Sequence, residues 1–285
     1  MNKETVIGID MGGTNIRAGL VSNNNLSSVI SQKINSKGSV KEVLQELFNL
    51  TDKLINTSVK AIGIGVPGLV DADEGVVFDM INIPSWKSVP LQQWMEKRYK
   101  IPVLINNDAN CFALGEYYFG KGKEYNSMIG VTIGTGLGSG VVINKRLYSG
   151  KNCGAGEFGM ADYLDKYCEY YASGQFFKNV YGIDGEVIFK NAKEGDKKAI
   201  KMYEELGSHL GNAIKMIMGS YDPEIIVLGG SVRHAWKYFN KTMWQRIKTF
   251  PYKRVADGLQ IEVSELENSG ILGAAALYYD NAKSI

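Results

Sequence analysis

The sequence predicts an α/β protein with two similar lobes and a cleft between them. The main observation is a glycine-rich strand-turn-strand pattern that occurs twice, at residues 7–21 and 129–143. The two segments align without a gap, so that Gly8 matches Gly130 and Gly12 matches Gly134. The length of 285 residues also suits two lobes that each bury a core. The repeat therefore indicates a duplicated architecture.

In the first half, aliphatic and β-branched runs alternate with amphipathic segments. Leucines recur on one face of residues 40–55, which predicts a helix, and residues 59–66 lead into a Pro-Gly turn, as a strand does. Residues 107–110, Asn-Asp-Ala-Asn, are suited to cap a following helix. The predicted strands are 5–10, 16–21, 26–34, 59–66 and 102–106, and the predicted helices are 40–55 and 91–99.

The second half opens with the repeated hairpin and passes through a loop-rich stretch at residues 149–174. In both halves an antiparallel hairpin precedes strands that are joined by crossover helices, which is typical of an α/β fold. The predicted helices of this half are 174–181, 197–219 and 270–279, and the predicted strands are 224–228 and 259–264.

Composition narrows the functional class. The hydrophobic fraction of 45%, the charged fraction of 22% and the net charge of +2 are those of a globular protein and do not favour binding to nucleic acid. The N-terminal residues pass directly into a strand-like run, and no apolar stretch reaches about 20 residues, so we expect neither export nor membrane insertion. Three cysteines at unpatterned spacings fit a reducing compartment. We therefore expect a cytoplasmic protein.

The two glycine turns suggest a phosphate site. Glycine permits positive φ and lets a phosphate approach backbone N–H groups closely, so two such turns facing each other can hold one nucleotide tail. Either segment alone is better explained as an ordinary hairpin. Their matching register favours the phosphate interpretation.

Nine short motifs follow one another along the chain. They lie at residues 10–17, 63–71, 82–86, 106–110, 133–140, 154–159, 171–174, 222–230 and 270–275. Taken in order, these motifs resemble the ROK family of sugar kinases and repressors, within the actin-like ATPase superfamily. The resemblance extends over nearly the whole chain and implies two ribonuclease-H-like lobes. It also implies a homodimer that phosphorylates a hexose or an N-acetylhexosamine with ATP, as glucokinases and N-acetylhexosamine kinases do.

The resemblance also implies a division of the chain. Residues 1–117 are expected to form the N-terminal lobe, which the helix at 270–285 completes. Residues 118–269 are expected to form the C-terminal lobe, with the second phosphate turn and the adenosine site.

Phosphoryl transfer needs a cradle for the phosphates, a metal ion and a base. We expect the cradle to consist of the two glycine turns, and Asp10, at a strand end, to organise hydrated Mg²⁺. Taken alone, Asp10 is better explained as a cap of a helix or turn. The expected nucleotide-binding residues are Gly12, Gly13, Thr14, Thr135, Gly136, Gly229 and Gly230.

Asp108 is the predicted general base, because the resemblance implies that the second residue of the Asn-Asp pair takes the proton of the attacking sugar hydroxyl. Without the resemblance, its place between a strand and a helix favours an N-cap role. The resemblance further implies that Asn107, Glu157 and Glu169 bind sugar hydroxyls and that the backbone of Gly68 approaches the sugar.

One segment departs from the family. ROK kinases commonly carry a histidine and three cysteines that bind a structural zinc, but the histidine position is Met160 here and the cysteine loop is largely deleted. Cys153 and Cys168 are too few to form a tetrahedral site, so we expect ATP and Mg²⁺ but no zinc. Met160 also cannot donate a hydrogen bond, which leaves the identity of the sugar open.

Other interpretations remain open at this point. A sugar-binding protein with weak or lost kinase activity is the main alternative, because Met160 falls in the expected substrate site. A DNA-binding repressor is not expected, since the first phosphate motif begins at Asp10. An actin-like or acetate-kinase relative would lack the Asn107, Asp108 and Glu157 set. His209 and His234 are expected to be surface or packing residues.

Overall fold

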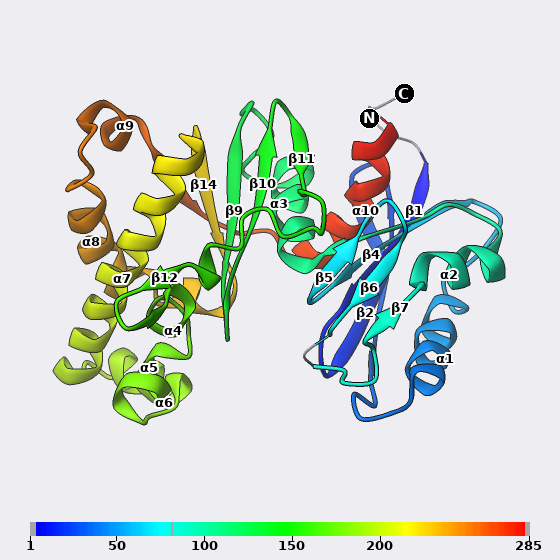
Figure 1. The fold of residues 1–285 in the computed structure, drawn as a ribbon, viewed down its shortest axis with the longest axis horizontal. Helices are drawn as coiled ribbons and strands as arrows, with labels where there is room; N and C mark the ends of the chain where they lie inside the picture. Colours follow the sequence, from blue (N-terminus) through cyan, green and yellow to red (C-terminus); the bar gives the residue numbers. More distant parts are fainter. Residues whose placement is uncertain (1–3, 81, 283–285) are drawn as a thin grey trace. The chain divides into compact units, whose positions relative to one another are not determined.

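The computed structural model describes residues 4–80 and 82–282 (Figure 1). Its strands are β1 (Thr5–Met11), β2 (Asn15–Ser22), β3 (Asn25–Lys33), β4 (Val59–Val66), β5 (Leu69–Asp71), β6 (Val76–Phe78), β7 (Ser88–Val89), β8 (Val103–Asn107), β9 (Met128–Ile133), β10 (Leu137–Ile143), β11 (Arg146–Tyr148), β12 (Asp162–Tyr163), β13 (Lys166–Tyr167), β14 (Ile225–Gly229) and β15 (Gln260–Val263). Its α-helices are α1 (Val40–Thr51), α2 (Leu91–Tyr99), α3 (Asp108–Phe119), α4 (Cys168–Ala172), α5 (Phe176–Tyr181), α6 (Gly185–Lys193), α7 (Lys197–Tyr221), α8 (Trp236–Ile247), α9 (Lys253–Gly258) and α10 (Ser269–Asn281), with 3₁₀ turns η1 (Phe158–Met160) and η2 (Ser231–Ala235).

The two largest sheets each have five strands in mixed parallel and antiparallel order. Their strand orders are β3-β2-β1-β4-β8 and β11-β10-β9-β14-β15, so the two sheets correspond strand for strand. The strands that open the two glycine-rich repeats, β1 and β9, are the central strands of their sheets. This confirms the predicted α/β fold, with two sheets of the kind found in actin-like lobes.

The chain forms two compact units. The first contains the residues up to Glu124, the segment Gly140–Ala155 and the residues from Glu265 onward, and the second contains Tyr125–Ser139 and Gly156–Ser264. The lobe limits at residues 117 and 269 that the sequence suggested stay a prediction.

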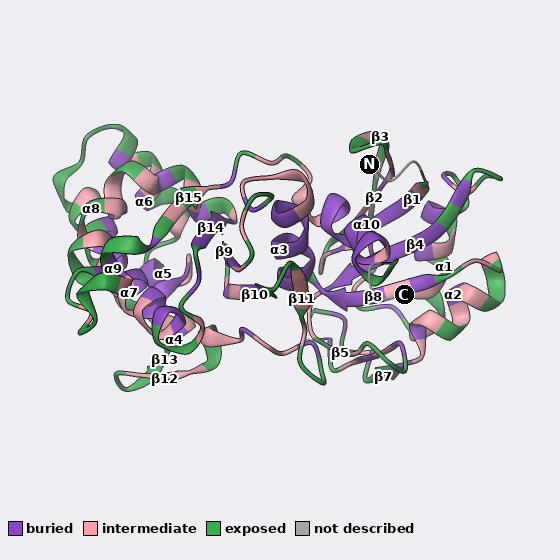
Figure 2. Cartoon of the chain, turned by 90° about the horizontal axis from the view of Figure 1, so that it is seen from above, coloured by how far each residue is buried: buried purple, intermediate pink, exposed green. Residues whose placement is uncertain are grey.

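In the first unit, glycines let α10 lie directly on the sheet. Gly8 and Gly63 are paired neighbours on the parallel strands β1 and β4. A Cβ at Gly8 would lie 2.0 Å from the carbonyl oxygen of Ile271, and one at Gly63 would lie 1.8 Å from that of Ala274. Both distances are far below van der Waals contact, so only glycine allows this approach. Buried residues are concentrated in α3, α10 and the strands beside them (Figure 2).

This close approach makes a stability prediction. We expect Gly63→Ala to lower the free energy of unfolding by about 1–3 kcal/mol or more, because the added methyl forces α10 away from β4. A urea titration that follows helix content measures the change. Gly258→Ala is the matched control: it has no atom within 4 Å of the added Cβ and should be neutral or stabilising. Equal midpoints for Gly63→Ala and the wild type would show that α10 does not lie this close.

The second unit is dominated by the 25-residue helix α7 and its partner α8. Asp196 caps α7 by accepting a hydrogen bond from the Ala199 N–H at 2.8 Å. Gly207 allows the two helices to approach, since a Cβ there would lie 2.3 Å from the carbonyl oxygen of Phe239. The fully buried strand β14 runs parallel to both β9 and β15. Through its pairing with β9, β14 supports the strand that leads into the second glycine turn.

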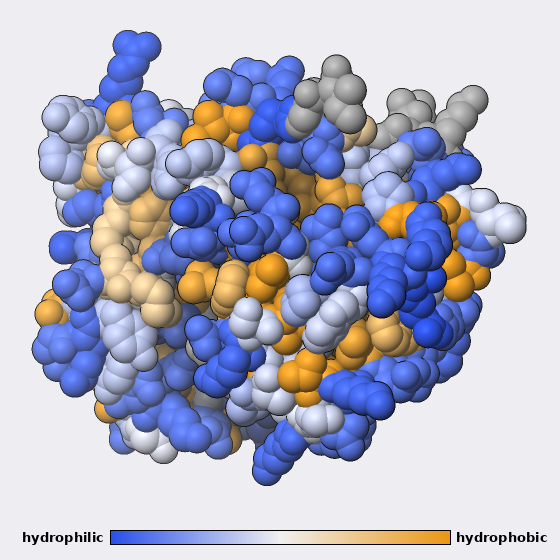
Figure 3. All heavy atoms as spheres, turned by 45° about the vertical axis from the view of Figure 1, so that its right-hand side comes forward, coloured by the Kyte–Doolittle hydropathy of each residue, from blue (hydrophilic) through white to orange (hydrophobic). Residues whose placement is uncertain are grey.

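The surface is that of a globular protein. The face drawn in Figure 3 is mostly hydrophilic, with apolar side chains scattered among polar ones. Among residues 4–80 and 82–282, no helix combines the length and the apolar character that a membrane span requires.

Candidate functional site

The carboxyl ends of three parallel strands bring the predicted first-unit residues together. Asp10 on β1 pairs with Gly65 on β4, which pairs with Asn106 on β8. The segments that follow these strands therefore emerge at one edge of the sheet, where α/β proteins usually place their ligands. A Cβ at Gly65 would lie 3.1 Å from the Cys111 sulfur and 3.8 Å from the Asp108 Cα, so both residues lie against this strand end. Burial raises the pKa of the Cys111 thiol, and the charges of Asp108 and Asp10 raise it further.

Asp10 lies at the beginning of α10. A Cβ at Gly270 would lie 2.7 Å from the Asp10 carboxyl carbon, so the glycine leaves room for the carboxylate at the helix N-terminus. Burial raises the pKa of Asp10, and the nearby Arg17 opposes that shift. Asn268 takes the N-cap position of α10. The Asp10 carboxyl is thus buried at the end of β1, where its ionised form is disfavoured.

The first glycine turn joins β1 to β2. The Gly12 N–H donates to the Asn15 carbonyl at 2.9 Å, which closes the turn, and Thr14 is exposed. A Cβ at Gly13 would lie 2.5 Å from the Cβ of Asn82, so this turn lies against the Asn82 side chain. The sequence placed Asn82 in a motif but not among the site residues.

Asn107, and not Asp108, caps α3. The Asn107 Oδ1 accepts from the N–H groups of Ala109 at 2.8 Å and Asn110 at 3.4 Å. Its Nδ2 donates to the Gly68 carbonyl at 3.1 Å, and Gly68 has a φ of +131°, which favours glycine. Asn107 is buried, whereas Asp108, the first residue of the helix, is exposed. The N-cap alternative for Asp108 is therefore wrong, because its neighbour occupies that position.

Two further asparagines hold this junction in place. The Asn106 Oδ1 accepts from the Asn107 N–H at 2.8 Å and from the Asn110 side chain at 2.9 Å. The Asn106 Nδ2 donates to Ser149 at 3.0 Å, and the Asn110 Nδ2 donates to the Cys153 carbonyl at 3.1 Å. These hydrogen bonds fix the backbone that carries Asp108.

In the second unit, Glu169 lies against the second glycine turn. The Glu169 Oε2 accepts from the Leu137 N–H at 2.8 Å, and a Cβ at Gly136 would lie 2.4 Å from the same oxygen. A Cβ at Gly159, two residues beyond Glu157, would lie 3.5 Å from the Glu169 Cβ. Burial raises the pKa of Glu157, and the charge of Glu169 raises it further. Met160, three residues beyond Glu157, is 55% exposed. The structure thus brings together two predicted sugar ligands and one predicted phosphate turn.

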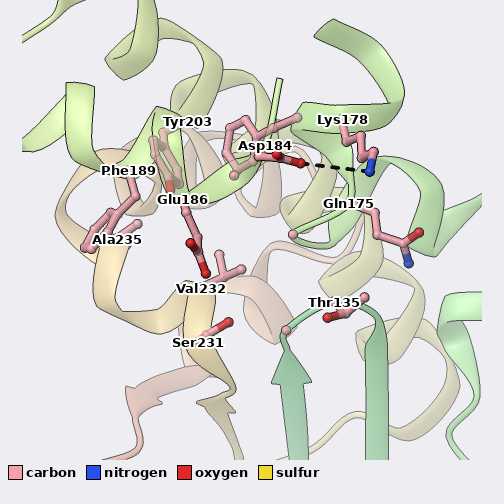
Figure 4. A pocket seen from close by; sticks show the side chains of 14 residues that line it. Thr135, Gln175, Lys178, Asp184, Glu186, Phe189, Tyr203, Ser231, Val232 and Ala235 are labelled. Carbon is pink, nitrogen blue, oxygen red and sulfur yellow. Dashed lines mark ion pairs between the residues drawn. The ribbon is translucent and has the colours of Figure 1, made fainter. Parts of the chain in front are cut away.

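A pocket of about 320 Å³ opens beside this turn (Figure 4). Thr135 lies at the turn between two strands on one side, and the Glu186 carboxylate reaches toward Val232 on the other. Gly230 comes just before the pocket wall; its φ is +77°, and a Cβ there would lie 2.3 Å from the Ile133 carbonyl oxygen. This volume falls within the range of small-molecule sites. The lining residues are Gly134, Thr135, Gly174, Gln175, Phe177, Lys178, Asp184, Gly185, Glu186, Phe189, Tyr203, Ser231, Val232 and Ala235.

The pocket combines apolar walls with polar groups at its mouth. Phe177, Phe189 and Tyr203 supply flat aromatic surface, on which a base can stack. Lys178 lies 4.0 Å from the carboxylate of Asp184, with both side chains exposed. Sequence reasoning found the turn residues but missed these walls, because they come from α5, α6 and α7 and share no short motif.

The residues present do not fit a structural zinc. Burial raises the pKa of Cys168 to about 12 and that of Cys153 to about 11, whereas zinc binds the thiolate. The two cysteines also belong to different units. Among the described residues, no group of three or more His, Cys, Asp or Glu side chains is arranged to hold a metal ion. Magnesium differs, since one or two carboxylates suffice when waters and phosphates complete its shell.

We therefore expect the purified protein to contain far less than one zinc per chain by elemental analysis. A zinc chelator that spares Mg²⁺ should leave both the melting temperature and the activity unchanged, since no four-ligand site is available. Stoichiometric zinc would show that Glu169 has been aligned wrongly with the family motif.

The chain is similar to known proteins over most of its length. The ROK family profile matches residues 6–281. A glucokinase of Thermotoga maritima is 27% identical over 313 residues, covering 97% of this chain and 98% of the relative. An N-acetyl-D-glucosamine kinase of Yersinia pseudotuberculosis is 32% identical over 303 residues, covering 95% and 98%. A crystal structure of a ROK family glucokinase from Streptomyces griseus with glucose and AMPPNP has a TM-score of 0.80 at 27% identity, covering 96% of this chain and 98% of that one.

Proposed function

The chain belongs to the ROK family, and we propose that it transfers the terminal phosphoryl group of ATP to a hydroxyl of a hexose or an N-acetylhexosamine. The observation that carries the proposal is the division of roles at the β8–α3 junction. Asn107 caps the helix, and three asparagines fix the backbone, while the exposed Asp108 is the first helical residue and its Oδ1 accepts from the Ala109 N–H at 2.9 Å. A rigidly held, exposed carboxylate suits a general base that takes the proton of the attacking hydroxyl.

The nucleotide is assigned to the second unit. The 320 Å³ pocket can accommodate a nucleoside, with aromatic surface for the base. The Glu186 carboxylate only accepts hydrogen bonds, so it suits the ribose hydroxyls. The turn at Thr135 and Gly136 would donate to phosphate oxygens, and Gly229 and Gly230 would form the floor. The structure from Streptomyces griseus was solved with AMPPNP, an ATP analogue, which supports the binding of a nucleotide.

In the first unit, Gly12, Gly13 and Thr14 would contact the phosphates, and Asp10 would hold hydrated Mg²⁺. The metal ion would neutralise charge on the phosphates when bound. Asp10 suits that role because its carboxylate is retained in a buried position where ionisation is costly.

The sugar would be held by Asn107, Glu157 and Glu169, with the Gly68 backbone nearby. The second hydrogen of the Asn107 amide and the Glu157 carboxylate would meet sugar hydroxyls, each of which needs a partner once it leaves water. The relatives from Thermotoga maritima and Yersinia pseudotuberculosis, a glucokinase and an N-acetyl-D-glucosamine kinase, support both sugar classes.

A panel assay tests the proposal. Purified protein with MgATP is offered glucose, mannose, fructose, allose, N-acetylglucosamine, N-acetylmannosamine and a β-glucoside, and ADP release is measured. We expect turnover of at least one sugar. Light scattering of the same sample tests the expected homodimer.

A second candidate, a sugar-binding protein with weak or lost kinase activity, is favoured by Met160. The exposed thioether cannot donate the hydrogen bond that a histidine supplies at this position in the resembled kinases. Calorimetric sugar binding without ADP release on any sugar of the panel would favour this candidate.

A further inference from the structure

The segment that carries Glu169 has little structure of its own. Glu169 lies on α4, which has five residues and no side-chain N-cap. The preceding hairpin of β12 and β13 has two residues in each strand, and the Cys168 N–H donates to the Ala161 carbonyl at 2.8 Å. Helices and hairpins this short are not stable alone in water. The position of Glu169 therefore depends on contacts with other elements.

His209 of α7 contacts both the hairpin and α4, and also α5. Its ring lies edge-on to Tyr163 of the hairpin, with ring centroids 5.7 Å apart. It also lies 5.2 Å from Tyr171 of α4 and 5.5 Å from Phe176 of α5. The His209 side chain is only 15% exposed. The histidine expected to be a surface or packing residue thus lies between the hairpin, α4 and α5.

A chain of hydrogen bonds fixes the orientation of this contact. Arg246 can only donate, and its Nε donates to the Asn212 Oδ1 at 2.6 Å. The Asn212 Nδ2 must therefore be the donor to the Tyr163 hydroxyl, at 2.5 Å. The hydroxyl proton is then available to His209 Nδ1, which lies 3.0 Å away.

In this arrangement His209 is neutral, and its Nε2–H faces Glu205, whose carboxylate lies 3.9 Å away and also accepts from Tyr181 at 2.5 Å. Burial lowers the pKa of His209, and Glu205 opposes that shift, which agrees with a neutral ring.

We propose that His209 and Tyr163 are positioning residues whose hydrogen bond ties the β12–β13 hairpin and α4 to α7. The tie holds the Glu169 carboxylate on the Leu137 N–H at the second glycine turn. Among the described residues, no metal ligand set lies in this part of the molecule. The hydrogen bonds run from Arg246 of α8 through Asn212 of α7 to Tyr163 of β12, and from there to His209 of α7. The inference rests on the proposed function only in the claim that Glu169 then binds a sugar.

The test uses Tyr163→Phe and His209→Phe in the full chain. Both keep a ring in place but remove one side of the hydrogen bond. Hydrogen exchange should become at least about tenfold faster at the Leu137 amide and in residues 161–172. The KM for glucose and for N-acetylglucosamine should rise about tenfold, with kcat and the KM for ATP within about twofold, because a sugar contact made throughout the reaction is weakened.

His209→Asn distinguishes hydrogen bonding from packing. Its side-chain oxygen can accept the Tyr163 proton, so this variant should lie closer to the wild type than His209→Phe in both measurements. Tyr252→Phe is the matched control, since Tyr252 lies in the second unit and is 72% exposed. It should change neither exchange nor kinetics.

Unchanged exchange at Leu137 in both ring variants would overturn the proposal. So would an Asn variant as impaired as the Phe variant, or faster exchange with an unaltered sugar KM. If the wild-type protein turns over no sugar of the panel, the proposed function is at fault, and the exchange measurements still decide whether the tie exists; if it turns over another sugar of the panel, the KM for that sugar is measured.

Discussion

Asp108→Asn is expected to reduce sugar phosphorylation by about 10²- to 10⁴-fold while the protein keeps its melting temperature. The rate falls because an amide cannot take the proton of the attacking hydroxyl. Stability is retained because Asn107 provides the N-cap of α3, with its Oδ1 on the N–H groups of Ala109 and Asn110. Steady-state ADP release and thermal unfolding of the same preparation measure both effects, and ATP affinity should change little.

Asn107→Ala is the matched control one residue earlier. It removes the cap and the hydrogen bond to Gly68, so it should cost about 1 kcal/mol, or about 2–4 °C in melting temperature. Activity within a few-fold of the wild type for Asp108→Asn would refute the assignment of the base. A large loss of melting temperature in Asp108→Asn would instead show that its carboxylate supports the helix.

The fold was predictable because its signals are local or repeated. The gapless match of Gly8 with Gly130 predicted two equivalent sheets, and the strand orders agree. The sequence predicted a helix at 40–55, whereas α1 ends at Thr51. Residues 52–54 form turns instead, and Leu54 and Ile55 continue the apolar pattern, which periodicity cannot distinguish from helix. The strands β5 to β7, of two or three residues, were missed because so short a run carries no period.

The candidate site was less predictable, because much of it depends on side-chain direction. The sequence identified the Asn107-Asp108 junction but could not say which residue caps the helix, since both types are good caps. It assigned Gly136 to the nucleotide and Glu169 to the sugar, and only the fold places the two in contact. His209 lies 46 residues from its partner Tyr163, and no sequence motif links them.

Asp10→Asn is expected to reduce activity by about 10²- to 10³-fold, as removal of a single electrostatic group in phosphoryl or acyl transfer does. The same change should leave the melting temperature equal to or above that of the wild type. The loss should be deepest at low Mg²⁺, because the carboxylate is proposed to hold hydrated Mg²⁺. Initial rates over a range of Mg²⁺ concentrations at fixed ATP measure this.

The stability expectation follows from the pKa of Asp10. Burial raises it above the ordinary value of 3.8, so the folded protein holds the proton more tightly than the unfolded chain does. The stability that the protonated carboxyl contributes is fully present below the unfolded pKa and is lost as pH rises through the folded pKa. Above the folded pKa, the ionised Asp10 therefore lowers the free energy of unfolding. A neutral amide of the same shape removes that cost.

Asp257→Asn is the control for a general effect of charge removal, since Asp257 is exposed on α9. It should alter neither activity nor the Mg²⁺ dependence. Asp10→Asn should also flatten the dependence of unfolding free energy on pH above 3.8, whereas Asp257→Asn should not.

Wild-type activity in Asp10→Asn would exclude the metal role. A melting temperature several degrees below that of the wild type would show instead that Asp10 mainly stabilises the beginning of α10, because the carboxylate would then contribute more at the helix N-terminus than its burial costs.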